Sequence, residues 1–268
     1  MLLHFSYEMQ DGFSQNVRDH HFSLMCIPRD TNRQRVIETN VAISPCSYKA
    51  EDTDFFGNRI IYGEAIDPHD SFSVKISGTV ETGLAPEEHR DTEQNVIFGL
   101  RTPLTAPGEK LRALYAELEK EAPAAVYDRA VYYMNAVGRL MEYVPGSTSV
   151  LTGAEGAARE GRGVCQDYAH ILISLLRMAG IPARYCVGMM TGEGASHAWA
   201  EAFCRGYWYG FDPVNGLLVD SSYIKLSHGR DYTDCIVNKG VFRGSCIENK
   251  TVSVSVAQID NNGETDNS

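Results

Sequence analysis

The chain has 268 residues, of which 43% are hydrophobic and 22% are charged, and these values are typical of a soluble globular protein long enough for two domains. Its 24 basic and 35 acidic residues give a net charge of -11, which argues against nucleic acid as a partner because such binding needs clustered positive charge. The first ten residues lack the features of a secretory signal, and no run of about 18 apolar residues could span a membrane, so we expect a cytoplasmic protein with no membrane partner.

Residues 1–80 are predicted to form an antiparallel β domain. Apolar or alternating runs are interrupted by turn-forming pairs such as Ser44-Pro45 and Asp67-Pro68. The runs predicted as strands are 4–7, 21–27, 34–43, 58–64 and 72–77. Residues 81–107 contain three prolines and are predicted to connect this domain to the next one.

Residues 108–259 are predicted to form an α+β core in which helices pack on an antiparallel sheet. Apolar residues recur three and four positions apart in 111–118, 124–143 and 164–179, which is the spacing of helices with a buried face. Gly180 and Pro182 are expected to end the third helix. Strands are predicted at 183–190, 197–204 and 207–211, and the polar, acidic residues 260–268 are predicted to form a disordered tail.

Three reactive residues fall at the ends of these predicted elements. Cys165 lies in the first turn of the third helix, where unpaired N–H groups favour a thiolate and can stabilise an oxyanion. His197 begins a strand and could act as a general base, while Asp212 ends the next strand and could orient the imidazole. Each residue alone is weak evidence, but the three together indicate a cysteine nucleophile activated by a histidine.

Other side chains close to these three in the sequence have simpler expected roles. Trp199 follows His197 by two positions on the same face of a strand and is expected to shield the imidazole from water. Gln166 is a candidate for the second oxyanion donor. A zinc site built from Cys165 and His197 lacks further closely spaced ligands, so we expect no metal and no cofactor. The other six cysteines form no CxxC pair and are expected to be reduced thiols.

The segments around these positions resemble the transglutaminase-like superfamily. They are Gly-Arg-Gly-Val-Cys-Gln-Asp-Tyr-Ala-His at 161–170, Leu-Arg-Met-Ala-Gly-Ile-Pro-Ala-Arg-Tyr at 176–185, Ala-Ser-His-Ala-Trp-Ala-Glu at 195–201 and Trp-Tyr-Gly-Phe-Asp-Pro-Val-Asn-Gly at 208–216. With its N-terminal β region, the chain is similar to bacterial transglutaminase-like proteins described as cysteine proteases. The resemblance implies a papain-like core in which Cys165 is the nucleophile, His197 the base and Asp212 its orienting partner. Asp-Pro-Val stands where this group usually has Asp-Pro-Thr, a change that we expect to be tolerated.

We expect hydrolysis of an amide or peptide bond in a protein or peptide substrate, through a thioester formed on Cys165. Two alternatives stay open, namely acyl transfer from glutamine to an amine and a non-catalytic peptide-binding module.

Overall fold

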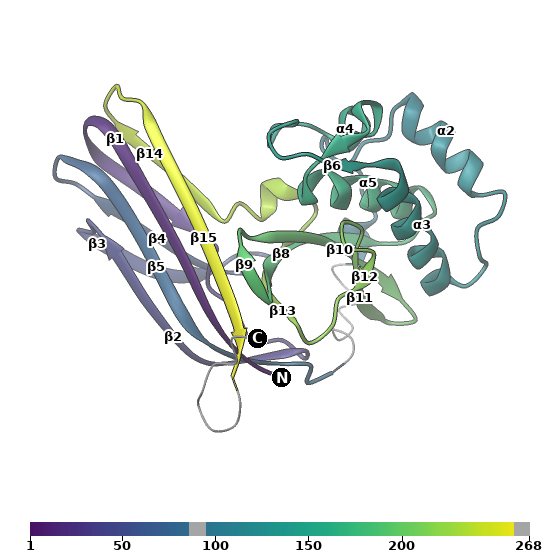
Figure 1. The fold of residues 1–268 in the computed structure, drawn as a ribbon, viewed down its shortest axis with the longest axis horizontal. Helices are drawn as coiled ribbons and strands as arrows, with labels where there is room; N and C mark the ends of the chain where they lie inside the picture. The colour runs from purple at the N-terminus through teal and green to yellow at the C-terminus, as the bar shows by residue number, and fades with distance from the viewer. Residues whose placement is uncertain (86–94, 260–268) are drawn as a thin grey trace.

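A computed structural model describes residues 1–85 and 95–259, and two β-sheets organise it. Figure 1 shows a large, strongly bent sheet on one side and a smaller sheet covered by helices on the other. The segments 86–94 and 260–268 lie outside the described residues, so part of the predicted connector and the predicted acidic tail are not addressed by the structure. No helix in the two described ranges is long and apolar enough to cross a membrane.

The N-terminal residues form the larger sheet, as predicted, but the runs 4–7 and 21–27 belong largely to one continuous strand, and the strand at 48–53 was not predicted. The first strands of this sheet are β1 (Leu2–Leu24), β2 (Gln34–Ser44), β3 (Tyr48–Thr53), β4 (Arg59–Ala65) and β5 (His69–Thr82). In the first half of β1 every second side chain is buried, which is the period expected of a strand with one face in a core. The strand β1 is long enough to pair with β5 near its beginning and with β4 near its end. The strand β1 therefore connects the part of the sheet that contains β5 with the part that contains β4.

The C-terminal strands return to this N-terminal sheet. They are β14 (Asn238–Arg243) and β15 (Glu248–Gln258), and both pair antiparallel with β1. The core was predicted to span residues 108–259. In the structure, about the last 20 described residues pair with β1 of the first domain instead. Strand periodicity in 252–256 indicates a strand but does not specify its partner, which lies at the opposite end of the chain. Figure 1 shows β1 and β15 side by side.

The second half forms the α+β unit predicted from the sequence. Its five-stranded antiparallel sheet has the order β12-β11-β10-β8-β13. The strands are β8 (Ala183–Met190), β10 (His197–Cys204), β11 (Tyr207–Asp212), β12 (Leu217–Leu218) and β13 (Tyr223–Gly229), and the three-residue strand β9 (Gly192–Gly194) lies in the loop between β8 and β10. A turn at Arg205-Gly206 joins β10 to β11.

Helices cover one face of this smaller sheet. They are α2 (Glu109–Leu118), α3 (Val126–Leu140), α4 (Ala154–Glu160) and α5 (Cys165–Met178), preceded by the single turn α1 (Asn95–Phe98) and followed after β13 by the 3₁₀ turn η1 (Tyr232–Asp234). The predicted helices correspond to α2, α3 and α5, whereas the short α4 was not predicted. Almost all of α5 is buried, and its apolar residues share a core with Ala198, Ala200 and Ala202 of β10. The small alanines let the helix approach the sheet closely.

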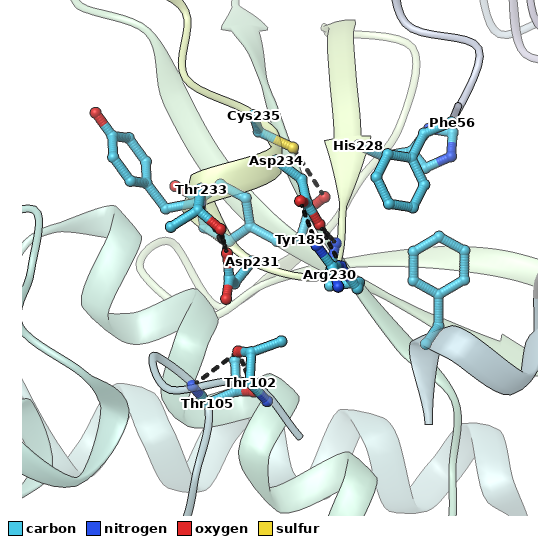
Figure 2. A network of polar contacts seen from close by, with 12 residues as sticks. Phe56, Thr102, Thr105, Tyr185, His228, Arg230, Asp231, Thr233, Asp234 and Cys235 are labelled. Carbon is cyan, nitrogen blue, oxygen red and sulfur yellow. Dashed lines mark hydrogen bonds and ion pairs between the residues drawn. The ribbon is translucent and has the colours of Figure 1, made fainter. Parts of the chain in front are cut away.

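A buried arginine ties the end of α5 to the connector and to the segment after β13. Arg177 donates to the carbonyl oxygens of Phe98, Ala183 and Arg230 at 2.7–2.8 Å, and to Oγ1 of Thr105 at 2.8 Å. Figure 2 shows the surroundings of this junction, where connector threonines face the segment 230–235. Burial lowers the pKa of Arg177 to about 10, so its guanidinium stays charged near neutral pH.

The N-terminal domain packs against the smaller sheet at its edge strand β13. Met189, Ile224 and Leu226 belong to the same apolar core as the buried residues of β1 and β5. Two amides extend this contact along β13: Gln34 exchanges hydrogen bonds of 2.8 Å with both backbone groups of Lys225, and Asn58 does the same for His228 at 2.8 and 2.9 Å. These side chains satisfy backbone groups that an edge strand would otherwise leave unpaired.

Candidate active site

The structure places Cys165 at the start of helix α5. Strands β6 (Glu142–Tyr143) and β7 (Arg162–Gly163) form a short parallel pair that leads the chain into the helix. The Asp167 carboxylate accepts the N–H of Val164 at 2.8 Å and the hydroxyl of Thr148 at 2.6 Å, and so caps the helix. A Cβ at Gly163 would lie only 2.6 Å from Oδ2 of Asp167, which explains the glycine before this turn. Cys165 is partly exposed at a helix N-terminus, as predicted.

His197 is positioned by pairing on both sides of its loop. It is the first residue of β10 and lies opposite Gly188 of β8. Just before it, β9 pairs with residues 254–256 of β15, so the loop that leads to His197 is attached to the N-terminal sheet. The side chain of His197 is 12% exposed. Both domains therefore hold the backbone that carries this imidazole.

Asp212 ends β11 and is fully buried. Its Oδ2 lies 2.8 Å from Nε2 of His197, and its Oδ1 accepts the backbone N–H groups of Val214 and Asn215 at 3.0 and 3.3 Å. Burial alone would raise the pKa of this carboxyl, but the hydrogen bond and the charge of His197, with further donors, hold the pKa below its usual value. Asp212 is consequently an anion near neutral pH.

The imidazole of His197 bridges the aspartate and the cysteine. Burial lowers the pKa of His197, but its hydrogen bonds with Asp212 and with the Cys165 thiol outweigh that effect and raise the pKa to about 9. Because Nε2 is engaged by the carboxylate, Nδ1 is the ring nitrogen left to accept a proton from the thiol. The arrangement can therefore hold a thiolate next to an imidazolium whose charge Asp212 stabilises.

Aromatic and apolar residues surround the nucleophile. Tyr143 is close enough for the charge of Cys165 to raise its pKa, after the larger effect of burial, and its side chain is half exposed. Tyr185 is buried near Cys165, and burial followed by that charge raises its pKa well above the usual value. Val150 and Leu151 are exposed on the loop that packs against the start of α5.

The remaining two predicted site residues lie near the centre but make different contacts. Trp199 is buried, and its ring centroid is 6.5 Å from that of His197, a position compatible with the predicted shielding of the imidazole. The side-chain amide of Gln166 donates to the carbonyl of Val150 at 3.2 Å. That amide is thus used in holding the 148–152 loop, and its role as oxyanion donor stays a prediction.

Two partners of Asp212 were missed by the sequence reasoning. Asn215 donates from Nδ2 to Oδ2 of Asp212 at 2.7 Å, and the Tyr223 hydroxyl donates to the same oxygen at 2.8 Å. Asn215 follows the aspartate by three residues in a turn, and that spacing could have indicated a contact. Tyr223 lies on β13, which is not a neighbour of β11 in the sheet, so nothing in the local sequence could indicate its contact.

The other cysteines are free thiols, and the described residues form no metal-binding cluster. Cys26, Cys186, Cys204 and Cys235 are buried, whereas Cys46 is exposed and Cys246 is partly exposed; all seven cysteines are free thiols. Within residues 1–85 and 95–259, no group of three or more His, Cys, Asp or Glu side chains is arranged to hold a metal ion.

Comparison with known protein families identifies both halves of the chain. Residues 99–213, which contain Cys165, His197 and Asp212, match the transglutaminase-like superfamily. Residues 4–81 match the bacterial transglutaminase-like N-terminal region. The chain belongs to the transglutaminase-like superfamily and carries the bacterial N-terminal region, so the predicted family and fold class are confirmed.

Individual relatives extend this similarity over nearly the whole chain. A protein of Mycobacterium leprae is 29% identical over 87% of this chain and 90% of its own length, and a protein of Mycobacterium tuberculosis H37Rv is 27% identical over 88% and 86%; both are uncharacterised. A crystal structure from Cytophaga hutchinsonii, named as a candidate cysteine protease, has a TM-score of 0.76 and 23% identity and covers 97% of this chain and 92% of that one. This last likeness shows that the two proteins share a fold.

Proposed function

We propose that this member of the transglutaminase-like superfamily is a cysteine-dependent hydrolase of amide or peptide bonds. The observation that carries the proposal is the position of His197, whose Nε2 is 2.8 Å from Oδ2 of buried Asp212 and whose pKa is raised by its interactions with Asp212 and with Cys165. A thiol beside an imidazole that is oriented by a carboxylate is the arrangement that acyl-enzyme catalysis requires.

The proposed reaction starts with the thiolate of Cys165, whose proton has moved to His197. Its sulfur attacks the substrate carbonyl, and the resulting oxyanion lies near the start of α5, where the backbone N–H of Cys165 has no partner within the helix. His197 then donates its proton to the leaving nitrogen, so that ammonia or an amine departs and a thioester remains. Water, deprotonated by His197, hydrolyses the thioester and regenerates the thiol.

The surroundings of the nucleophile support a protein or peptide substrate. Tyr143, Val150 and Leu151 are exposed on the two segments that flank Cys165, and they could contact apolar side chains on either side of the attacked carbonyl. The seven free thiols fit a reducing compartment, so we keep the cytoplasm as the proposed location.

Mass spectrometry of glutamine-containing peptides distinguishes hydrolysis from acyl transfer. Peptides are incubated with the full-length protein with and without excess methylamine, and Cys165→Ala serves as the control. We expect chain cleavage or deamidation that depends on Cys165 and persists in the presence of methylamine. Dominant incorporation of methylamine would instead indicate a transglutaminase, while products that also form with Cys165→Ala would contradict the proposed nucleophile.

A further inference from the structure

The carboxylate of Asp212 has more hydrogen-bond donors than orienting a histidine requires. Three of them converge on Oδ2, namely Nε2 of His197, Nδ2 of Asn215 and the hydroxyl of Tyr223, at 2.8, 2.7 and 2.8 Å. The backbone N–H groups of Val214 and Asn215 already occupy Oδ1. Two neutral side chains therefore compete with His197 for one oxygen atom.

We propose that Tyr223 and Asn215 are positioning residues that fix the orientation of the Asp212 carboxylate and weaken its hold on the His197 proton. This inference rests on the proposed function, because it assigns both side chains a role in the acid and base steps of that reaction. Neither residue needs to touch the substrate for this role.

Tyr223 is built to act as a fixed donor. Its side chain is almost fully buried, and its ring packs edge-on against Trp199, with a centroid distance of 5.5 Å, and lies 6.3 Å from the ring of His197. The ring comes from β13, whereas Asp212 ends β11, so the hydroxyl braces the carboxylate from a separate strand. A carboxylate held from three directions cannot rotate about its last side-chain bond, which otherwise has a broad energy minimum.

The charges around this group favour a neutral phenol. Burial, followed by the charge of Asp212 and that of Asp220, raises the pKa of Tyr223, so its hydroxyl remains protonated throughout the range in which the enzyme would work. His197 faces the Asp212 carboxylate on its other side, and the imidazole in turn interacts with Cys165. Tyr223 consequently donates to Asp212 whether His197 is charged or neutral.

The competition among the donors changes the pKa of His197 in one predictable direction. Each neutral donor spreads the negative charge of the carboxylate and weakens the remaining hydrogen bonds to that oxygen. Removing one donor leaves more charge facing His197, so the imidazolium is stabilised and the pKa of His197 rises. The imidazolium then becomes a weaker acid toward the leaving nitrogen, and the carboxylate gains freedom to rotate.

The test compares Tyr223→Phe and Asn215→Ala with the wild-type protein. The two measurements are the NMR titration of the His197 imidazole and the pH dependence of Cys165 alkylation by iodoacetamide. We expect the pKa of His197 to rise by about 0.5–1 unit in Tyr223→Phe and by less in Asn215→Ala, whose side chain is exposed. The rate of peptide hydrolysis should fall about tenfold or more in Tyr223→Phe through the loss of orientation.

Tyr133→Phe is the matched control. Tyr133 is a fully buried phenol that donates to a carboxylate, Glu119, on the helical side of the core. This variant should lose stability without any shift of the His197 titration. Loss of stability alone lowers the active fraction at every pH and does not move a pKa.

The results separate the inference from the function on which it rests. A His197 pKa that is unchanged or lower in both Tyr223→Phe and Asn215→Ala would overturn the inference, even if Cys165 remained reactive. Slow alkylation of Cys165 in the wild-type protein would contradict the proposed function instead. If Tyr223→Phe did not fold, the titration of Asn215→Ala alone would decide, because that side chain lies on the surface and donates to the same oxygen.

Discussion

At the scale of single residues, the chemistry depends on an imidazole that binds its proton more tightly in the folded protein than in the unfolded chain. The pKa of His197 is about 9 in the folded state against 6.5 for an ordinary histidine, despite burial that opposes the charge. The hydrogen bonds and the charges of Asp212 and Cys165 supply the difference. The site thus couples its reactivity to the stability of the fold.

This coupling predicts a pH dependence of stability. Because the folded state has the higher pKa, the stabilisation by His197 is complete below about pH 6.5 and is lost as the pH rises toward 9. Urea unfolding measures this effect. Across this pH range, the free energy of unfolding should fall by up to about 3 kcal/mol more in the wild-type protein than in His197→Gln. Parallel curves for the two proteins would contradict the assignment.

The sequence could predict the three central residues because each of them marks the end of an element. Cys165 lies where a helical period begins, and His197 and Asp212 lie where strands begin and end. The same reasoning failed for Tyr223, since its contact with Asp212 depends on the order of strands in the sheet. It also could not show that the amide of Gln166 is engaged by the carbonyl of Val150.

At the scale of elements, helix α5 is held in place by contacts at both of its ends. The Asp167 cap fixes its first turn, and Arg177 joins its last turn to three other segments. The position of Cys165 relative to the sheet therefore depends on polar contacts as well as on the apolar core.

Arg177→Lys should destabilise the protein by about 2–4 kcal/mol, because an ammonium cannot reproduce the planar set of donors and leaves buried carbonyl groups unpaired. Chemical denaturation followed by tryptophan fluorescence would measure the loss. Arg159→Lys, at an exposed arginine paired with Glu155, is the matched control and should change stability by less than about 0.5 kcal/mol. Equal small effects of both substitutions would show that the Arg177 junction contributes little.

Gly188 of β8 allows close packing against both neighbouring strands, β13 and β10. A Cβ on Gly188 would lie 2.1 Å from the carbonyl oxygen of Ile224 and 2.5 Å from the ring of Trp199. We expect Gly188→Ala to cost about 2–4 kcal/mol and to displace the tryptophan beside His197, with loss of activity. Thermal unfolding of both variants checks this, and Gly194→Ala, where an added Cβ meets nothing within 4 Å, should be nearly neutral. A neutral Gly188→Ala would show that the strands relax more easily than the geometry indicates.

At the scale of the whole molecule, the N-terminal domain forms part of the support for the site. It packs against the smaller sheet at edge strand β13, binds the backbone of β13 through Gln34 and Asn58, and attaches the loop before His197 to β15. The strand and helix types were predictable from local periodicity. The return of residues 238–258 to the first sheet was not, because pairing between the two ends of a chain leaves no local pattern.

Because Gln34 and Asn58 bind the backbone of β13, a substitution in the first domain should change the stability of the second. Gln34→Ala removes both partners of the Lys225 backbone groups and should lower the free energy of unfolding by about 2–4 kcal/mol. Both tryptophans lie on the smaller sheet, so their fluorescence during urea unfolding reports on the second domain. Gln15→Ala, on the exposed part of β1, should have little effect. If the two variants unfolded alike, the domains would be less dependent on each other than their contacts indicate.

The central claim is that the fold activates one thiol among seven, and its rate of alkylation tests this claim most directly. Iodoacetamide labelling near pH 6.5, with peptide mapping by mass spectrometry, compares Cys165 with Cys46 and Cys246, the other two cysteines that are not buried. We predict that Cys165 reacts at least about tenfold faster, because only the thiolate is nucleophilic, and that His197→Ala removes this advantage. Labelling of Cys165 no faster than that of exposed Cys46 would contradict the account.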